Sequence, residues 1–138
     1  MKKLFSFLFI TTMLFTAASQ AQNQKATYNK LSPTEFKAQL TKDNGFLMDV
    51  RTPEEYMKES IRGAKLCNIN DENFGAILEM LDKNRPVYVY CEHGNRSAQA
   101  ADLMMKQGFK KVCHLDGGLD AYKAAKMETF SQTKQVAK

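Results

Sequence analysis

The segment PVYVYCEHGNRSAQAADLMM, residues 86–105, determines the predicted fold and carries the residue with the clearest chemistry. Its first five residues are a short apolar run, which predicts a buried β-strand. A polar loop at residues 91–97 follows. The alanine-rich remainder then predicts a helix from about Ser97 to Gln107 that stops at Gly108. A strand, a tight loop and a helix in this order are typical of an α/β domain.

Cys91 stands where the predicted strand meets this loop, and we refer to residues 91–97 as the Cys91 loop. The N–H groups of such a loop and the positive end of the next helix dipole converge on one point and stabilise a thiolate. Gly94 permits the positive φ that lets a loop curl around an anion. We therefore interpret Cys91 as a nucleophile. The alternative is a buried structural cysteine at a strand end.

The rest of the chain alternates short apolar runs with signals for helix starts. Ser32-Pro33-Thr34-Glu35 and Thr52-Pro53-Glu54-Glu55 are capping boxes with proline at the first helical position. The full prediction has strands at 46–50, 65–69, 87–90 and 111–115, and helices at 33–40, 53–58, 71–81, 97–107 and 119–126. This order predicts an α/β fold in which helices cover both faces of a parallel sheet.

In such a fold the ligand site lies at the carboxyl ends of the strands, near a change in strand order. The Cys91 loop lies on that edge, as do residues 49–51 and 116–118. Arg51 and Arg96 are the candidates for binding an anionic substrate there. Each has an alternative role: Arg96 as a surface residue in the first turn of a helix, and Arg51 as the structural partner of Asp49.

Three further side chains near the loop need a role. His93 could act as a general base toward the thiol. A short curled loop tends to turn alternate side chains outward, however, so we expect His93 to face solvent. A carboxylate beside a thiolate disfavours its charge, so we expect Glu92 to point away. His114 is expected to pack in a buried strand rather than to bind a metal.

The first 21 residues have the pattern of a secretory signal peptide. Lys2 and Lys3 precede an apolar run over residues 4–15, and Ser19-Gln20-Ala21 fits a cleavage site. The alternative is an uncleaved membrane anchor, although the run is shorter than the ~20 residues of a spanning helix. We predict a signal peptide at 1–21, a flexible lead-in at 22–30, one domain at 31–126 and a loose tail at 127–138. The protein is then periplasmic or secreted.

Cleavage would leave 138 − 21 = 117 residues with a net charge of (20 − 2) − 15 = +3, because the signal holds two lysines and no acids. A mild positive balance suits a soluble domain that attracts a small anion. No basic stripe with interleaved aromatic residues suggests nucleic-acid binding. No other segment is apolar enough to span a bilayer, so no stable membrane association is expected after cleavage.

Cys67, Cys91 and Cys113 are the only cysteines, and an odd number in an exported protein leaves at least one thiol free or paired between chains. No C-x-x-C spacing suggests a zinc site or a dithiol redox motif. Cys67 and Cys113 fall in predicted strands. We therefore expect both to be buried and inert, and Cys91 alone to react with thiol reagents.

These residues resemble the rhodanese family of sulfurtransferases in single-domain form, from about residue 31 to residue 125. Four motifs in order carry the resemblance: Asp49-Val50-Arg51 with Glu54, Glu55 and Tyr56; Ile61-Arg62-Gly63-Ala64; the Cys91 loop; and Gly117-Gly118-Leu119-Asp120-Ala121-Tyr122. Two positions depart from the family pattern: Glu59-Ser60 replaces Gly-His, and Tyr122 replaces a frequent tryptophan. These departures affect the end of a helix and the rim of the site, and with them the donor preference.

The resemblance implies a rhodanese-like α/β fold and a catalytic Cys91 that takes a sulfane sulfur from a donor such as thiosulfate. The persulfide would pass this sulfur to cyanide or to a thiol, including a protein thiol, without a metal or an organic cofactor. The implied substrate-binding residues are Arg51, Glu92, His93, Gly94, Asn95, Arg96 and Ser97. Two covalent steps predict ping-pong kinetics.

Three other functions share features with this interpretation. A phosphatase or arsenate reductase has a Cys-x5-Arg loop, whereas this chain has Cys-x4-Arg and places Ser97 where arginine would be needed. A binding module of the same fold usually lacks the loop cysteine. A non-enzymatic persulfide or redox carrier in the export compartment is also compatible with the sequence.

Overall fold

The computed structural model describes residues 27–131 and 133, so the predicted signal peptide lies outside the described residues. Strands and helices alternate along the described chain. They are β1 (Asn29–Leu31), α1 (Pro33–Asp43), β2 (Phe46–Asp49), α2 (Pro53–Lys58), β3 (Lys65–Leu66), α3 (Phe74–Glu79), β4 (Val87–Tyr90), α4 (Asn95–Lys106), β5 (Val112–Leu115) and α5 (Gly118–Ala124). None of the helices in these ranges combines the length and the apolar character that crossing a bilayer requires.

The strands form one parallel sheet in the order β1-β5-β4-β2-β3. β4 is central and pairs with β2 on one side and with β5 on the other. From β4 the chain continues to β5, whereas β2 continues to β3 in the opposite direction. The strand order therefore changes direction beside β4, and its carboxyl end is the expected place for a ligand site.

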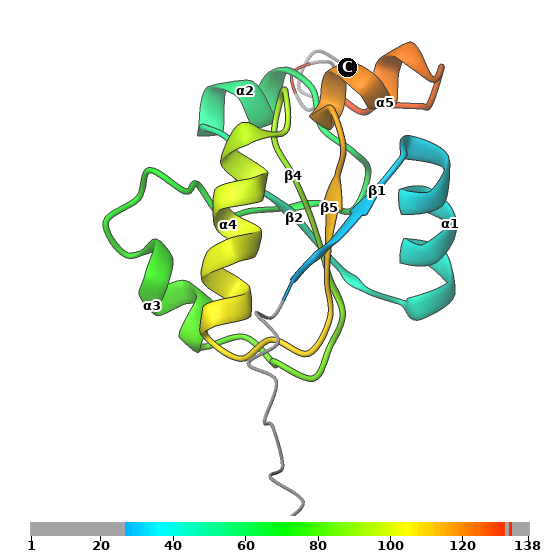
Figure 1. Cartoon of the computed structure of the whole chain (residues 1–138). Helices are drawn as coiled ribbons and strands as arrows, with labels where there is room; N and C mark the ends of the chain where they lie inside the picture. Colours follow the sequence, from blue (N-terminus) through cyan, green and yellow to red (C-terminus); the bar gives the residue numbers. More distant parts are fainter. Residues whose placement is uncertain (1–26, 132, 134–138) are drawn as a thin grey trace, which may run out of the picture.

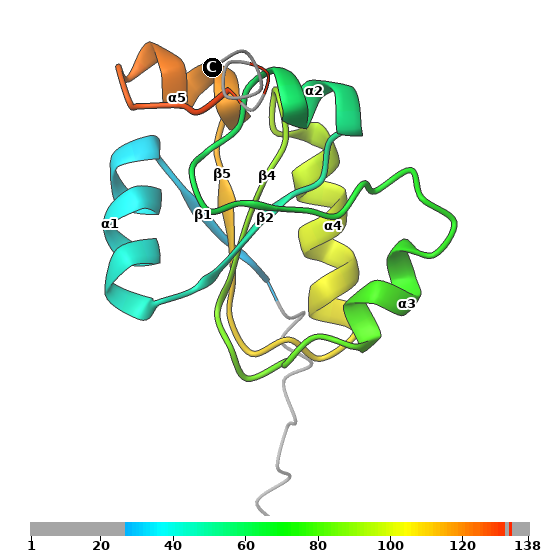
Figure 2. The same ribbon diagram turned by 180° about the vertical axis from the view of Figure 1, so that it is seen from behind.

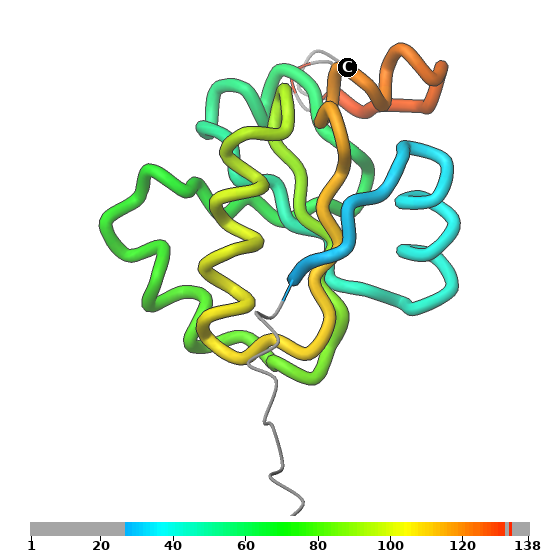
Figure 3. The backbone as a smooth tube through the Cα atoms, viewed as in Figure 1, coloured from blue at the N-terminus to red at the C-terminus, as the bar shows by residue number. Residues whose placement is uncertain are grey.

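Helices cover both faces of this sheet, so the predicted fold class is confirmed. α3 and α4 lie on one face and α1 lies on the other (Figures 1 and 2). α2 and α5 lie at the end of the sheet where β4 and β5 finish. The tube in Figure 3 shows how short the turn from the end of β4 into α4 is.

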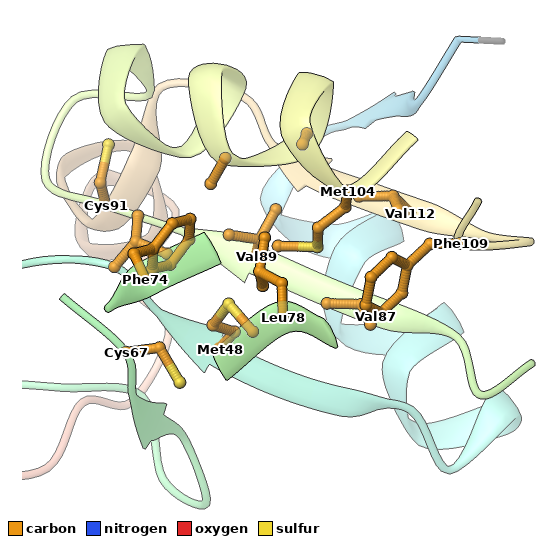
Figure 4. Close-up of a cluster of buried hydrophobic side chains, with 13 residues drawn as sticks. Met48, Cys67, Phe74, Leu78, Val87, Val89, Cys91, Met104, Phe109 and Val112 are labelled. Atoms are coloured by element: carbon orange, nitrogen blue, oxygen red, sulfur yellow. The ribbon is translucent and has the colours of Figure 1, made fainter. Parts of the chain in front are cut away.

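Two apolar clusters fill the space between the sheet and its helices, and β4 contributes to both. Val87 and Val89 pack on the α3–α4 side, and Tyr88 and Tyr90 pack on the α1–α5 side. All four side chains are buried, as expected for a central parallel strand. Figure 4 shows the first cluster, with Cys91 at one end of it.

The two predicted capping boxes are present. The side chains of Ser32 and Thr52 each accept a hydrogen bond from the N–H group three residues later. The carboxylates of Glu35 and Glu55 accept from the N–H groups of the caps in return. These contacts start α1 and α2 at the predicted residues, because they satisfy N–H groups that have no partner within the helix.

Several boundaries of strands and helices differ from the prediction. Residues Asn29–Leu31 form the edge strand β1, although the sequence predicts a lead-in up to residue 30. Backbone pairing with β5 fixes this strand, so no apolar pattern is needed. β3 ends at Leu66 rather than at residue 69. α3 is shorter than the predicted 71–81, because the Asp71 side chain accepts from the N–H of Asn73 and forms a turn.

The end of the domain also differs. Residues 127–131 pack against it, so the loose tail predicted at 127–138 is wrong for this part. Phe130 and Ser60 exchange two backbone hydrogen bonds, of 2.7 and 2.8 Å. The Thr129 hydroxyl donates to Glu59 at 2.6 Å, and the Arg62 guanidinium lies 4.5 Å from the centre of the Phe130 ring.

Candidate active site

β4 places Cys91 at the carboxyl edge of the sheet, where its side chain is 1% exposed. The Cys91 Sγ accepts a hydrogen bond from the N–H of Gly94 at 3.1 Å. It also lies 3.4 Å from the N–H group and 3.4 Å from the hydroxyl oxygen of Ser97. We call these three groups the Cys91 hydrogen-bond donors. They are suited to an anionic sulfur, because hydrogen bonds to a charged acceptor are the stronger ones.

A positive φ at Gly94 makes this arrangement possible. Gly94 has a φ of 105° and is the N-cap of α4, which begins at Asn95, two residues before the predicted start. Within the described ranges, the N–H groups of His93, Asn95 and Arg96 donate to no acceptor. These groups lie at or beside the positive end of the 12-residue helix α4, so they are available to a negatively charged ligand. The side chain of Asn95 is exposed.

The first turn of α5 holds the outer side of the loop. Leu119 N–H donates to the Cys91 carbonyl at 2.8 Å, and Asp120 N–H donates to the Glu92 carbonyl at 3.1 Å. The C=O and N–H of one trans peptide point in opposite directions, so the N–H that follows each carbonyl faces away from α5. Gly118 permits this contact, because a Cβ there would lie 2.5 Å from both carbonyl oxygens.

Arg51 is buried and paired with carboxylates, which favours the structural alternative over a role in anion binding. Its side chain is 2% exposed, and it donates to both carboxylate oxygens of Asp49 over 2.7 to 3.2 Å, to Glu92 and to the carbonyl of Glu59. Burial alone would lower the pKa of the guanidinium, but the hydrogen bonds and charge of Asp49 outweigh it and raise this pKa. The structure supports the alternative of an Asp49–Arg51 pair.

Glu92 is neutralised by two cations. Its Oε2 atom binds Arg51, and its Oε1 atom lies 3.5 Å from the Nζ atom of Lys123. The carboxylate is therefore engaged with Arg51 and Lys123 rather than left as a bare charge beside the Cys91 sulfur.

Arg96 and His93 are paired as well. Arg96 makes a bidentate ion pair with Glu55, at 2.7 and 2.8 Å, in the first turn of α4. This hydrogen bonding holds the pKa of Glu55 at about 2. His93 faces solvent, as expected, and its Nδ1 atom lies 2.8 Å from Asp120. Among the described residues His93 has no hydrogen bond to Cys91, so the geometry does not support a general-base role.

A known protein family matches most of this chain. The family described as rhodanese-like domain matches residues 32–125, which is more than half of the chain. The chain belongs to the rhodanese-like domain family. The protein named thiosulfate sulfurtransferase GlpE from Pseudomonas paraeruginosa is 30% identical over 98 residues, which cover 71% of this chain and 86% of that protein. Its namesake from Coxiella burnetii is 34% identical over 97 residues, which cover 70% of this chain and 89% of that protein.

Solved structures agree on the rhodanese-like fold. The NMR structure of the rhodanese-like domain of an Anabaena protein superposes with a TM-score of 0.65 at 30% identity. The superposition covers 76% of this chain and 80% of that one. The predicted family and fold are therefore both confirmed, and the named sequence relatives are sulfurtransferases.

The Cys91 loop has two neighbours that were not among the predicted site residues. Gly118 closes the loop from outside, as described above. His114 is buried as predicted, but its Nδ1 atom lies 3.0 Å from the hydroxyl oxygen of Ser97. No sequence signal places His114 at the site, because its position depends on the sheet register. Val89 and His114 are partners in the sheet, so His114 comes close to the end of β4.

The other two cysteines of this rhodanese-like domain are buried and free, as expected. Cys113 lies within β5, and Cys67 directly follows β3. Burial raises the pKa of both thiols, which disfavours the nucleophilic thiolate form.

The two departures from the rhodanese pattern have clear positions. Ser60 makes the backbone pair with Phe130 that holds residues 127–131 against the domain. Tyr122 is buried in the cluster on the α1–α5 side. Neither residue contacts the Cys91 sulfur among the contacts of the described chain.

Proposed function

We propose that this protein is a sulfurtransferase that carries a sulfane sulfur on Cys91 as a persulfide. The observation that supports this most is the set of Cys91 hydrogen-bond donors at the carboxyl end of β4. Loading moves the negative charge outward by one atom, from the thiolate to the terminal sulfur. The N–H groups of His93, Asn95 and Arg96, which have no acceptor among the described residues, supply the donors that this outer atom needs.

The first step consumes no proton, oxidant or reductant. The Cys91 thiolate attacks the sulfane sulfur of thiosulfate and forms a new S–S bond. The bond between that sulfur and the sulfonate sulfur breaks, and sulfite leaves with the electron pair. A thiolate and a dianion thus become a persulfide anion and a sulfite dianion, so charge is conserved.

The second step returns the enzyme to its starting form. Cyanide, or the thiolate of a small molecule or a protein, attacks the outer sulfur of the persulfide. The S–S bond breaks toward Cys91, which leaves as a thiolate, and the product is thiocyanate or a new persulfide. Because the two substrates react in turn with one residue, the kinetics are ping-pong.

Main-chain groups rather than a free guanidinium meet the charge of the donor in this proposal. Arg51 and Arg96 are both paired with carboxylates. The two named relatives carry thiosulfate in their names, which makes thiosulfate the first donor to test. Polysulfide and mercaptopyruvate are the next two donors.

We also propose that the protein is exported, because residues 1–21 have the pattern of a signal peptide. The mature chain then begins at Gln22 and acts in the periplasm or outside the cell. N-terminal sequencing of protein from the native host tests this: a start at Gln22 supports export, and a start at Met1 in the soluble cell fraction contradicts it.

Intact-protein mass spectrometry tests the sulfur transfer. Reduced protein is incubated with thiosulfate and weighed before and after addition of cyanide. We expect a gain of one sulfur atom in the wild type and in Cys113→Ala, no gain in Cys91→Ala, and loss of the sulfur to cyanide as an equal amount of thiocyanate. No gain with any of the three donors, or a gain that persists in Cys91→Ala, overturns the proposal.

Turnover separates an enzyme from a carrier. A sulfurtransferase forms many equivalents of thiocyanate for each protein molecule in excess thiosulfate and cyanide. A carrier that only loads and delivers one sulfur to its partner stops near one equivalent.

A further inference from the structure

Ser97 connects the Cys91 sulfur to a buried histidine. The Ser97 Oγ atom lies 3.4 Å from Cys91 Sγ, 3.0 Å from His114 Nδ1 and 3.1 Å from the carbonyl oxygen of Gly94. Cys91 and Ser97 are at most 1% exposed, and His114 is 4% exposed. A continuous chain of polar atoms therefore runs from the sulfur through Ser97 to His114 in β5, and the proposed reaction does not otherwise use His114.

The hydroxyl group of Ser97 has one proton to donate and three neighbours that could accept it. The Gly94 carbonyl and an anionic sulfur can only accept. His114 Nδ1 donates when it carries the ring proton and accepts when the proton is on Nε2. With the proton on Nδ1, the imidazole donates to Ser97 Oγ and the hydroxyl proton is free to point at the sulfur. With the proton on Nε2, Nδ1 competes with the sulfur for the hydroxyl proton.

The surroundings of His114 favour a neutral ring. Burial lowers the pKa of His114, and the two charged groups near it act in opposite directions. Asp116 raises this pKa and Lys30 lowers it, and their side chains pair with each other at 3.1 Å. The Tyr28 ring packs edge-on against the imidazole, with 5.5 Å between centroids. A neutral imidazole has a single N–H, so its tautomer decides what Ser97 receives.

We propose that His114 is a positioning residue, which directs the Ser97 hydroxyl proton to the Cys91 sulfur by donating its own Nδ1–H to Ser97 Oγ. This arrangement is favoured once the sulfur is anionic, since a hydrogen bond to a charged acceptor is roughly twice as strong as one between neutral groups. The inference rests on the proposed function for the role of the sulfur. It adds His114 as the residue that orients the Ser97 hydroxyl, one of the three Cys91 hydrogen-bond donors.

The test is the rate of Cys91 alkylation by iodoacetamide across a pH series, read by peptide mass. His114→Asn keeps an amide N–H near the position of Nδ1, whereas His114→Gln moves it toward the position of Nε2. We expect His114→Gln to shift the midpoint of the pH profile upward and to slow alkylation at neutral pH roughly five- to tenfold, the effect of one hydrogen bond. His114→Asn should stay within about twofold of the wild type.

A double-mutant cycle with Ser97→Ala shows whether His114 acts through Ser97. We expect Ser97→Ala to slow alkylation about as much as His114→Gln, and the double variant to be no slower than Ser97→Ala alone. Equal slowing by His114→Gln with and without the Ser97 hydroxyl overturns the inference. So does an unchanged pH profile in His114→Gln, or equal loss in the Asn and Gln variants.

Thermal unfolding of each variant shows which of them are folded, and the Asn and Gln variants differ only in where the amide lies. Alkylation needs no sulfur donor, so the two proposals can fail separately. Sulfur loading without coupling between His114 and Ser97 overturns this inference and leaves sulfur transfer standing. Coupling without loading supports the positioning role and overturns sulfur transfer.

Discussion

Cys91 lies just past the end of β4, and Cys113 lies within the neighbouring strand β5. Their burial is almost equal, 1% and 0% exposed, but their surroundings differ. The Cys91 sulfur is held by the N–H of Gly94 and by two groups of Ser97. The Cys113 sulfur lies 3.9 Å from the amide nitrogen of Asn29 and also near the side chain of Tyr88. Burial raises the pKa of Cys113. Exposure therefore does not distinguish the two cysteines, whereas their hydrogen-bond partners do.

The difference follows from the place of each cysteine along its strand. Cys113 lies inside β5 and pairs with Asn29 on one side and with Tyr88 on the other, so the nearby N–H groups belong to the sheet. Cys91 lies one residue past the end of β4, where the ladder stops and the chain curls at Gly94. The N–H groups of the loop are then free for the sulfur. In the proposed function, this position at a strand end lets the N–H groups of the loop stabilise negative charge on the Cys91 sulfur.

Thiol labelling gives the largest expected contrast. Iodoacetamide on the native protein should modify Cys91 and leave Cys67 and Cys113 unmodified. Burial raises the pKa of the latter two thiols, whereas the Cys91 hydrogen-bond donors can bind an anionic Cys91 sulfur. All three cysteines should react after unfolding in denaturant. Peptide mass mapping reads the result. Labelling of Cys113 in the native protein as fast as Cys91 would break the comparison.

Substitution of Arg51 tests whether this residue stabilises the fold or binds the anionic substrate. Arg51→Met should lower the free energy of unfolding by about 3–5 kcal/mol, because it leaves the charge of Asp49 buried without a partner. Urea unfolding measures this, and Lys30→Met, which removes an exposed ion pair with Asp116, is the control with little expected change. Unchanged stability together with a raised KM for thiosulfate would return Arg51 to its sequence-based role as an anion-binding residue.

Gly118 tests how closely the loop must be held. A Cβ at this position meets the carbonyl oxygens of Cys91 and Glu92 at 2.5 Å, so Gly118→Ala must displace the loop. We expect sulfur transfer to fall on the order of 100-fold, as for a misplacement of about 1 Å in an active site. Gly75→Ala is the matched control, because nothing lies within 4 Å of its added Cβ. Equal activity of the two variants contradicts the role given to α5.

Glu55 gives the smallest expected effect, on stability in acid. Hydrogen bonds from Arg96 hold the pKa of Glu55 at about 2, below its ordinary value of 4.5. The stabilisation is therefore complete above about pH 4.5 and is lost as the pH falls toward about 2. Glu55→Gln keeps a side chain that can serve in the capping box and removes only the charge. Its urea midpoint should fall less between about pH 6 and about pH 3 than that of the wild type, and an equal fall in both contradicts this account.

Local chemistry made much of the fold predictable. Proline and the capping boxes at Ser32 and Thr52 fixed two helix starts, since each is a contact between residues three positions apart. The apolar runs placed β2, β4 and β5 correctly. Strand β1 was missed because Asn29 and Lys30 are exposed and only Leu31 is buried. What holds this strand is the backbone of β5, more than 80 residues away along the chain.

The candidate site also combines local contacts, which the sequence predicts, with contacts between distant residues, which it does not predict. Cys91, Gly94 and Ser97 lie within seven residues, so their convergence follows from one loop. The role of Arg51 depends on Glu92, which is 41 residues away, and the contact of Ser97 with His114 depends on the register of β4 with β5. Sequence alone left both open, because each depends on contacts that only the assembled sheet creates.

A structure of the protein after loading with thiosulfate would show where the transferred sulfur is bound. We expect one extra sulfur bonded to Cys91 Sγ, with this outer atom within hydrogen-bond distance of N–H groups of the Cys91 loop. Extra sulfur on Cys67 or Cys113, or a Cys91 persulfide whose outer sulfur points into the apolar cluster with Phe74, would contradict this expectation.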